Sequence, residues 1–423
     1  MPHFAEIAER VLAGGEAATR EEALAMLNAS DAETFALVDA ASTLRRHFFA
    51  NTVKVNYLVN LKSGLCPEDC TYCSQRLGSE ADVLKYTWIK SNEAVKQATY
   101  GIQGGASRVC MVASGRGPTD RDVERVSGMI ENLKSEHPEV EVCACLGHLK
   151  DGQAQRLKQA GVDAYNHNIN TAESHYTEIC STHTYQDRVD TVNEAQAAGM
   201  SACSGLIVGM RETNEQVVEA IFALRDMGSD SIPVNFLMPF DGTPLEGTWD
   251  LTPMQCLRIL ATVRMVAPDK ELRMAGGREI HLRSLQSLAL HVVNSLFLGD
   301  YLTSVGQSAL DDLKMIRDGG FEVLGAEGRD LVAEHEEFLR AHGVAPGDDV
   351  PAPVTTPCGT TVDGGCGGCA SEGSCGHTAP VDVAAATTAA AATDSGLETS
   401  EGGRVETVIP RKRGVGTLER PNA

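Results

Sequence analysis

From about residue 53 the chain alternates short β-rich runs with longer helical stretches, and this alternation most constrains its fold. The predicted strands are residues 53–59, 108–112, 140–146, 164–169, 202–208, 232–236, 271–274 and 292–296. The predicted helices between them are residues 91–103, 120–134, 152–160, 186–198, 214–227, 253–266 and 280–291. Alternation of this kind indicates a parallel sheet of the α/β class. Eight strands predict a complete (β/α)₈ TIM-type barrel.

The segments on either side of this pattern have different compositions. Residues 4–47 are predicted to be helical, and Thr19-Arg20-Glu21-Glu22 is typical of a capping box. Beyond residue 345 the chain is rich in Pro, Gly, Thr and Ala, with too little apolar bulk to pack a core. We therefore expect an N-terminal helical extension (1–47), a barrel (48–345) and a disordered tail (346–423).

Charge and cysteine content narrow the function. A net charge of −22 argues against nucleic acid or an anionic membrane as the main partner. The N-terminus shows no secretory pattern and no apolar run reaches the ~20 residues of a membrane span, so we expect a cytoplasmic protein. Thirteen cysteines, an odd number, then favour metal-binding or catalytic thiols over disulfides.

Cys66, Cys70 and Cys73 lie in one short loop after the first predicted strand. Three thiolates in such a loop favour an iron–sulfur cluster or zinc. A 4Fe–4S cluster normally takes four cysteines, and the next one is Cys110, so one iron would be left open for a small molecule. The alternatives are a structural zinc site lacking one ligand, or three unrelated thiols.

Unusual residues also fall on the predicted strands. Cys110, Cys143, Cys203 and Arg273 lie on four different strands and could converge inside one barrel as a second metal centre. A lone strand cysteine is more often a small buried apolar group, and this is how we interpret three others, Cys145, Cys180 and Cys256. Arginine is a poor metal ligand, and its ordinary role is to bind a carboxylate or phosphate.

Three asparagines, Asn166, Asn168 and Asn170, alternate through the end of the fourth predicted strand, and Asn235 lies on the sixth. Side chains at i and i+2 of a strand share a face, so we expect the three to point the same way. Amides offer both donors and acceptors, which suits a cyclic urea, a carboxylate or a ribose. The alternative is ordinary turn chemistry at a strand end.

These residues together carry a family resemblance. The run Cys66-Pro67-Glu68-Asp69-Cys70-Thr71-Tyr72-Cys73-Ser74-Gln75 resembles the loop of radical S-adenosylmethionine enzymes, and as a whole it is similar to the biotin synthase family. Further agreement comes from Tyr165-Asn166-His167-Asn168, Cys203-Ser204-Gly205 leading to Gly209, and Ala275-Gly276-Gly277-Arg278-Glu279. The similarity extends from about residue 45 to 345. The cysteine loop alone would identify only the superfamily.

The resemblance implies two iron–sulfur clusters and a radical reaction. Cys66, Cys70 and Cys73 would hold a 4Fe–4S cluster that binds S-adenosyl-L-methionine and cleaves it to a 5′-deoxyadenosyl radical, which abstracts hydrogen from dethiobiotin. A 2Fe–2S cluster, the source of the inserted sulfur, would have the ligands Cys110, Cys143, Cys203 and Arg273. Asn166, Asn168 and Asn235 would face dethiobiotin, with Asn168 also near the cofactor. Asn170 stands where some members carry an aspartate that contacts the ribose, so a charge-assisted contact would be lost.

The resemblance also implies partners: a small electron-transfer protein of the flavodoxin or ferredoxin type, cluster-assembly proteins and a second copy of the chain. Two alternatives remain, a radical enzyme that moves carbon fragments and a non-enzymatic iron–sulfur cluster carrier. The tail adds a separate hypothesis, a metal-binding or cluster-handling appendage, against incidental thiols. Its candidate ligands are Cys358, Cys366, Cys369, Cys375 and His377.

Overall fold

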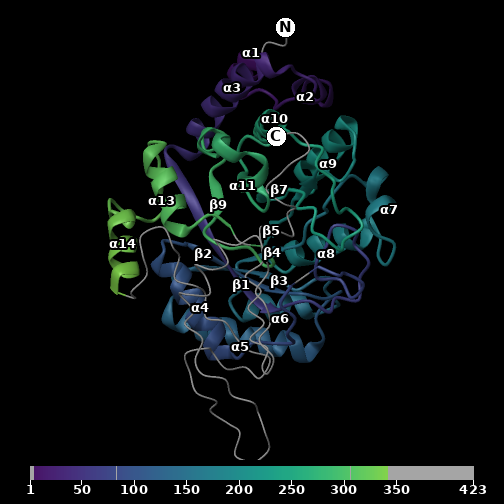
Figure 1. Ribbon diagram of the computed structural model, residues 1–423, viewed down its shortest axis with the longest axis vertical. Coiled ribbons are helices and arrows are strands. Elements are labelled where there is room, and N and C mark those ends of the chain that lie inside the picture. Colours follow the sequence, from purple (N-terminus) through teal and green to yellow (C-terminus); the bar gives the residue numbers. More distant parts are fainter. Residues whose placement is uncertain (1–3, 82, 305, 342–423) are drawn as a thin grey trace, which may run out of the picture.

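The computed structural model describes residues 4–81, 83–304 and 306–341. Its centre is a closed barrel of parallel strands (Figure 1), in which β1 pairs with both β2 and β9. The strands β5 and β6 follow each other at one position, since both pair with β7, so eight positions are filled and the predicted TIM-type barrel is confirmed. The barrel strands are β1 (Thr52–Lys62), β2 (Arg108–Ala113), β3 (Glu141–Cys145), β4 (Ala164–Asn166), β5 (Ser201–Cys203), β6 (Leu206–Val208), β7 (Ser231–Phe236), β8 (Glu271–Met274) and β9 (Ser295–Phe297).

Helices cover the outside of the barrel (Figure 1). The main ones are α4 (Ser91–Gln103), α5 (Asp120–Glu136), α6 (Gln153–Gln159), α8 (Tyr185–Ala197), α9 (Asn214–Asp226) and α10 (Pro253–Val266). Four of them begin with a threonine N-cap in a capping box, which satisfies free backbone N–H groups at the helix start. These caps are Thr119, Thr184, Thr213 and Thr252.

Alternate strand residues enter two different hydrophobic clusters. Val109 and Met111 of β2 belong to the large cluster that the helices cover, whereas Cys110 belongs to a smaller cluster formed by several strands. Both faces of β2 are therefore buried, which is why its sequence after Arg108 is a continuous apolar run rather than an alternating one. The smaller cluster is the barrel interior, where the candidate site lies.

The N-terminal helices are confirmed, including the capping box at Thr19: α1 (Phe4–Leu12), α2 (Arg20–Leu27) and α3 (Asp31–Phe49). They pack beside α10 at one side of the barrel (Figure 1). The guanidinium of Arg45 donates to the carbonyl oxygens of Thr52 and Val293, at the amino ends of β1 and β9. This extension therefore covers the amino end of the strands, opposite the carboxyl end where TIM-type barrels place their active sites.

Several predicted elements were wrong in extent. The predicted strand 53–59 continues to Lys62, and the predicted strand 292–296 is Ser295–Phe297. Strand β4 stops at Asn166 instead of residue 169, and Asn170 has a φ of 70° that no strand residue adopts. The predicted strand 202–208 is interrupted at Gly205, where a Cβ would lie 1.9 Å from the carbonyl oxygen of Pro233. The predicted helix 280–291 is three short pieces, α11 (Arg278–His281), η2 (Arg283–Leu285) and α12 (Gln286–Ala289).

Two helices and a short strand after the barrel were not predicted: α13 (Ala309–Asp318), β10 (Glu322–Val323) and α14 (Leu331–Ala341). The strand β10 pairs with Thr52 and Val53, at the start of β1. The predicted disordered tail, with Cys358, Cys366, Cys369, Cys375 and His377, lies outside the described residues. Within the described ranges, no helix is both long and apolar enough to cross a membrane.

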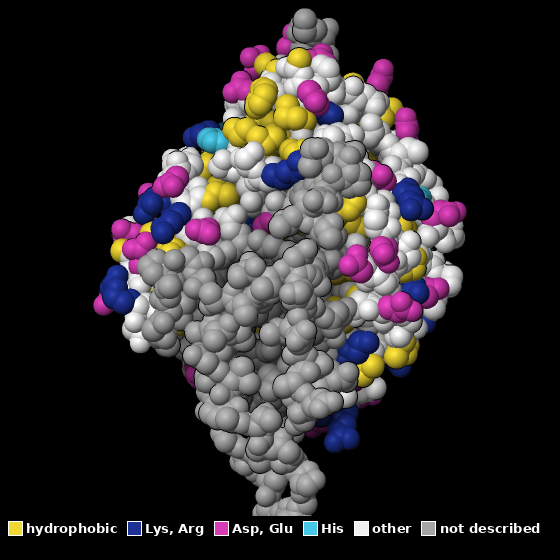
Figure 2. Space-filling model, in the orientation of Figure 1, with side chains coloured by type: hydrophobic (Ala, Val, Ile, Leu, Met, Phe, Trp, Pro, Cys, Tyr) yellow, Lys and Arg dark blue, Asp and Glu magenta, His cyan; other side chains and the backbone are white. Residues whose placement is uncertain are grey.

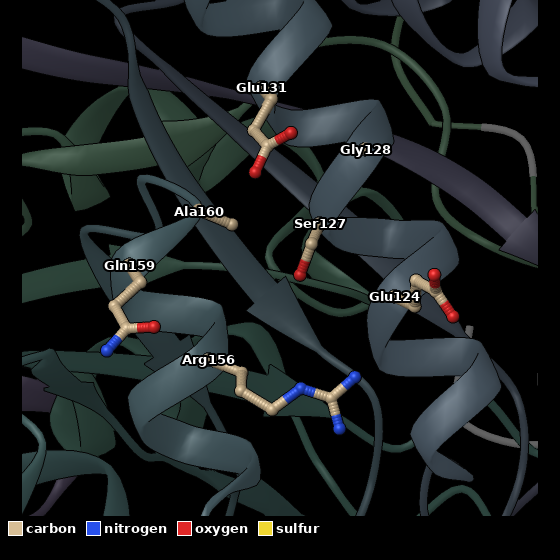
Figure 3. Close-up of a pocket in the computed structure, with 7 residues that line it drawn as sticks. All are labelled: Glu124, Ser127, Gly128, Glu131, Arg156, Gln159 and Ala160. Carbon is tan, nitrogen blue, oxygen red and sulfur yellow. The ribbon is translucent and has the colours of Figure 1, made fainter.

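Figure 2 shows acidic and basic side chains interspersed over the described part of the visible face. Hydrophobic side chains gather over the N-terminal helices in the same view, and Leu12, Phe35 and Phe48 of α1 and α3 are among the exposed ones. A shallow groove lies between α5 and α6, with Glu124, Glu131 and Arg156 at its walls (Figure 3). This groove is in the outer helical layer, away from the cysteines of the barrel interior.

Candidate metal centres

The cysteine loop follows directly from β1 and is held by its own backbone. The Cys66 N–H donates to the Gln75 carbonyl at 3.0 Å, and the Cys73 N–H donates to the Cys70 carbonyl at 3.2 Å. Backbone N–H groups also point at two sulfurs: those of Glu68 and Gly115 at Cys66, and those of Gln75 and Arg76 at Cys73. Such N–H···S contacts stabilise thiolate ligands of iron–sulfur clusters, so this donor set fits a cluster.

Burial raises the pKa of the loop thiols. It lifts the pKa of Cys66 above its usual range and that of Cys73 to about 11. The pKa of Cys70 is raised by its hydrogen bond to Cys180 and by burial. Because metal ligands must be deprotonated, these thiols stay protonated near neutral pH until a metal displaces the proton.

A second segment, residues 179–183, holds the loop from the side. The Thr71 N–H donates to the Ile179 carbonyl at 2.9 Å. The Asp69 carboxylate accepts from the backbone N–H groups of Ser181 at 3.0 Å and Thr182 at 3.2 Å. Burial opposes ionisation of Asp69, but its hydrogen bonds from this segment outweigh burial and hold its pKa well below the usual range. The loop is thereby fixed against α7 (Tyr176–Ile179).

Cys180 belongs to this segment. It is buried, as predicted, but its sulfur has polar neighbours and so is not a purely apolar group. It is 5% exposed, but its sulfur lies 3.7 Å from the Cys70 sulfur and 3.3 Å from Nδ1 of His183. The hydrogen bond from the Cys70 thiol, opposed by burial and aided by His183, lowers the pKa of Cys180 to about 4. The other two cysteines interpreted in this way, Cys145 and Cys256, are partly and fully buried.

The three strand cysteines converge inside the barrel, as expected. Cys110 of β2 and Cys143 of β3 are direct neighbours in the strand register, and Cys203 ends β5. All three are buried and share one cluster with Phe297. Cys143 hydrogen-bonds to both of the others, which raises its pKa well above the usual range. The pKa values of Cys110 and Cys203 fall because of the hydrogen bond from Cys143 and the nearby positive charge of Arg273, although burial opposes the change.

Arg273 completes this group from β8 and is 1% exposed. Its Nη1 lies 3.7 Å from Sγ of Cys203. Its other nitrogens are occupied: Nη2 donates to Ser231 at 2.9 Å and to the Glu271 carboxylate, and Nε donates to Ser295 at 3.2 Å. Arg273 therefore does bind a carboxylate, that of Glu271, as is ordinary for arginine. This contact leaves Nη1 facing the thiol of Cys203.

A layer of largely buried charge, with the 43% exposed Glu141 at its edge, lies on the amino side of these thiols. Glu271 contacts Arg273, Arg108 at 3.0 Å and Lys54 at 3.8 Å, and Glu141 contacts Arg108 at 2.8 Å and Lys54 at 2.7 Å. Burial would raise the pKa of Glu271, but the positive charges of Arg273 and Arg108 outweigh it and keep that carboxyl ionised. These contacts fix the position of the Arg273 guanidinium.

The four asparagines do not form one array. Asn166 donates to the Cys203 sulfur at 3.1 Å and to Asn168 Oδ1 at 3.2 Å, so these two remain neighbours. Asn170 turns away from them, because the strand has ended and its φ is positive. Its side chain lies 2.6 Å from the Tyr72 hydroxyl, and with its oxygen facing Arg188 it accepts from that guanidinium at 3.1 and 3.2 Å. Asn235 donates to the Leu206 carbonyl and accepts from the Gly276 N–H, both backbone groups.

Comparison with known proteins identifies the family. The sequence model described as "Radical SAM superfamily" matches residues 61–224, and that of the "Biotin and Thiamin Synthesis associated domain" matches residues 233–322. The biotin synthase of Saccharopolyspora erythraea is 66% identical over 79% of this chain and 94% of its own length. That of Streptomyces avermitilis is 55% identical over 96% of each chain. The chain belongs to the biotin synthase family.

A further relative agrees with this placement, and two solved structures share the fold. The biotin synthase of Kocuria rhizophila is 63% identical over 90% of this chain and 81% of its own length. Among solved structures, methylornithine synthase (PylB) superposes with a TM-score of 0.67 over 78% of this chain and 99% of its own, at 18% identity. The hydrogenase maturase HydG of Carboxydothermus hydrogenoformans gives 0.63 over 76% and 79%, at 16% identity. At these identities the two structures show the shared fold alone.

The sequence analysis of this biotin synthase family member missed several residues that contact the candidate ligands. Glu271 and Arg108 each precede a predicted ligand by two positions on the same strand, Arg273 and Cys110 respectively. The i, i+2 relationship places them on the same face, so this signal could have found them. No comparable signal exists for Cys180 and His183, because they approach Cys70 from a segment more than a hundred residues away.

Proposed function

We propose that this chain inserts sulfur into dethiobiotin to form biotin, the last step of biotin biosynthesis. The observation that carries the proposal is the convergence of Cys110, Cys143, Cys203 and Arg273 inside the barrel of a chain that also bears the three-cysteine radical loop. Relatives named biotin synthase, 55–66% identical, support it. A radical enzyme of carbon-fragment chemistry or a cluster carrier would not need the thiols of the barrel interior.

Membership of the radical S-adenosylmethionine superfamily implies a 4Fe–4S cluster and S-adenosyl-L-methionine. The residues that would hold the cluster are Cys66, Cys70 and Cys73, and the backbone N–H groups aimed at two of these sulfurs support the assignment. When bound, the cluster would supply the electron for reductive cleavage of the cofactor. The loop's contribution is to carry all three thiols on one short backbone segment that is fixed against residues 179–183.

Cys110, Cys143, Cys203 and Arg273 would hold a 2Fe–2S cluster, which supplies the inserted sulfur. Nη2 and Nε of Arg273 are hydrogen-bonded to Glu271, Ser231 and Ser295. Its remaining nitrogen, Nη1, therefore stays aimed at Cys203. Asn166 donates a hydrogen bond to the Cys203 sulfur and would moderate its negative charge. The closed barrel keeps water from these thiols, which protects reactive intermediates.

The asparagines would bind the two small molecules. Asn166 and Asn168, adjacent at the carboxyl end of β4, would face dethiobiotin, with Asn235 near the Gly276 turn. Asn168 and Asn170 would contact S-adenosyl-L-methionine. The Asn170 side chain contacts the hydroxyl of Tyr72 in the cysteine loop. This contact supports the assignment of Asn170 to the cofactor site.

The chain would act with other proteins in the cytoplasm. We expect a flavodoxin- or ferredoxin-type protein to supply electrons and cluster-assembly proteins to rebuild the sulfur donor. We also expect a homodimer, which light scattering of the purified chain would test. Neither nucleic acid nor a membrane is an expected partner.

Anaerobic reconstitution with iron, sulfide, dethiobiotin, S-adenosyl-L-methionine and a reductant tests the function. We expect both 5′-deoxyadenosine and biotin. Cys143→Ala should still form 5′-deoxyadenosine but no biotin, while Cys256→Ala, a buried cysteine of α10, should form both. Formation of 5′-deoxyadenosine without biotin by the unaltered chain would reject sulfur insertion, and formation of neither would reject radical chemistry as well. Arg273→Ala is a weaker test, because loss of one ligand can be tolerated.

A further inference from the structure

Cys70, Cys180 and His183 form a compact group of ligand atoms beside the cysteine loop. All three side chains are buried, and one ligand atom from each lies within 4.8 Å of the other two. The two sulfurs are 3.7 Å apart, and the Cys180 sulfur lies 3.3 Å from Nδ1 and 3.7 Å from Nε2 of His183. The function proposed above uses only Cys70 of these three residues.

The spacing matches the coordination sphere of one small metal ion. Tetrahedral zinc has bonds of about 2.3 Å to sulfur and about 2.0–2.1 Å to nitrogen, which place two sulfurs about 3.8 Å apart and a sulfur and a nitrogen about 3.6 Å apart. The observed distances of 3.7 Å from sulfur to sulfur and from sulfur to Nε2 agree with both values. Two of the three pairs therefore already have the spacing of ligands on one ion, and the Cys70 sulfur lies within 4.8 Å of a His183 ring nitrogen. A fourth position would be left for water.

His183 is already held in the tautomer that a metal requires. Arg188 donates to Nε2 at 2.9 Å, so Nε2 carries the lone pair and Nδ1 donates to the Glu68 carboxylate at 2.5 Å. A carboxylate on the far nitrogen is the usual support of a metal-binding histidine. A metal ion would replace one hydrogen bond of Arg188, whose guanidinium would still be held by the Asn168 carbonyl at 2.8 Å and by the Tyr176 hydroxyl.

Charge balance also favours a divalent ion. Two thiolates and a neutral imidazole would neutralise a 2+ ion, so the filled site would itself carry no net charge in its buried position. Arg188 and Glu68, on either side of the imidazole, carry opposite charges in addition. Thiolate and imidazole ligands together select zinc-like ions over magnesium or calcium.

We propose that, in the chain without its iron–sulfur clusters, Cys70, Cys180 and His183 bind one thiophilic divalent metal ion. Because Cys70 is shared, this ion and a 4Fe–4S cluster at the loop would exclude each other. The site would therefore hold the loop in place before cluster assembly and would compete with assembly when zinc is present. The proposal concerns the cluster-free chain, so it does not depend on whether biotin is formed.

The test uses the full-length chain, freed of iron, reduced and anaerobic, with one equivalent of Zn²⁺. Alkylation of each cysteine by N-ethylmaleimide is followed peptide by peptide by mass spectrometry. We expect Zn²⁺ to slow the alkylation of both Cys70 and Cys180. The alkylation of Cys66 and Cys73 should slow much less. Slowing of the three loop cysteines without Cys180, or no slowing of Cys70 and Cys180, would overturn the proposal.

Two variants and a control make the test specific. Cys180→Ala and His183→Gln should each weaken the protection of Cys70 by Zn²⁺ about tenfold or more, whereas Cys256→Ala should leave it unchanged. Cys180→Ala also removes a thiol that reacts with N-ethylmaleimide. His183→Gln retains every thiol, so a loss of protection in this variant reports on the metal site alone. Far-UV circular dichroism checks that both variants are folded. Full protection of Cys70 by Zn²⁺ in both folded variants would also overturn the proposal.

Discussion

Nη1 of Arg273 lies 3.7 Å from Sγ of Cys203, while Nη2 of the same guanidinium is held by the Glu271 carboxylate. One side chain thus connects the layer of buried charge near the amino ends of the strands with the thiols of the barrel interior. Because Ser231 and Ser295 bind the same guanidinium, its orientation is set before any cluster is present. The geometry of the proposed sulfur-donor site depends on this charge layer as much as on its own ligands.

The first prediction concerns Glu271. We expect Glu271→Gln to lower the free energy of unfolding by about 3–5 kcal/mol, because Arg273 and Arg108 then lose a buried counter-charge. Urea unfolding followed by circular dichroism measures the change. Glu139→Gln is the control, since that side chain is 69% exposed and its replacement should change stability by at most about 0.5 kcal/mol. Equal effects of the two substitutions would contradict the role given to Glu271.

The second prediction concerns the hydrogen bond from Asn166 to the Cys203 sulfur. Asn166→Asp removes the donor and places a carboxylate against a thiolate, so we expect biotin formation to fall about 10- to 100-fold. At saturating dethiobiotin, which offsets any weaker binding of the substrate by Asn166, formation of 5′-deoxyadenosine should fall much less, because the loop cysteines are untouched. The two products are quantified in the same reconstituted reaction. Asn214→Asp, at an exposed position of α9, should leave both rates unchanged, and parallel loss of both products in Asn166→Asp would contradict the assignment.

The barrel could be predicted from sequence because its strands are buried on both faces and its helices begin at strong caps. The exceptions have local causes. Asn170 adopts a positive φ that ends the fourth strand early, and Gly205 breaks the fifth because only glycine fits against Pro233. An i, i+2 argument from sequence then placed the asparagines on one face, which holds for Asn166 and Asn168 but not for Asn170.

The candidate site could be predicted in part. The candidate ligand residues on the strands could be singled out because cysteine and arginine are unusual at barrel-facing positions. The contact of Cys180 with Cys70 could not be found in this way, because it joins two loops rather than two strands. Contacts between irregular segments have no periodicity in the sequence, so they become visible only once the fold has brought the segments together.

The third prediction concerns a buried ion pair near the carboxyl side of the barrel. Arg278 and Asp312 are both fully buried, and Nη2 of Arg278 lies 2.7 and 2.8 Å from the two carboxylate oxygens. We expect Asp312→Ala to lower the free energy of unfolding by about 3 kcal/mol, because the buried Arg278 loses its bidentate carboxylate partner and keeps only one carboxylate contact, with Glu279 at 3.2 Å. Asp318→Ala, whose side chain is 68% exposed, is the matched control on the same helix. A loss below about 1 kcal/mol for Asp312→Ala, measured by urea unfolding, would show that water reaches Arg278.

The last prediction concerns the pH dependence of stability at His335, which lies on α14 and is 3% exposed. Nε2 of His335 has no hydrogen-bond partner among the described residues, and burial lowers the pKa of its imidazole. Between its unfolded pKa of about 6.5 and its lower folded value, the unfolded chain takes up a proton that the folded chain refuses. The contribution of this group to stability is therefore present above about pH 6.5 and lost as the pH falls below it.

His335→Leu removes this titration and keeps the site apolar. Relative to its own value at pH 8, we expect the variant to lose about 1 kcal/mol less stability at pH 5.5 than the unaltered chain loses. Histidines elsewhere titrate in both proteins and cancel in the comparison. Urea unfolding at half-unit steps from pH 8 to pH 5 measures the two curves, which should be parallel above pH 7. Curves that stay parallel down to pH 5 would show that His335 is protonated in the folded chain.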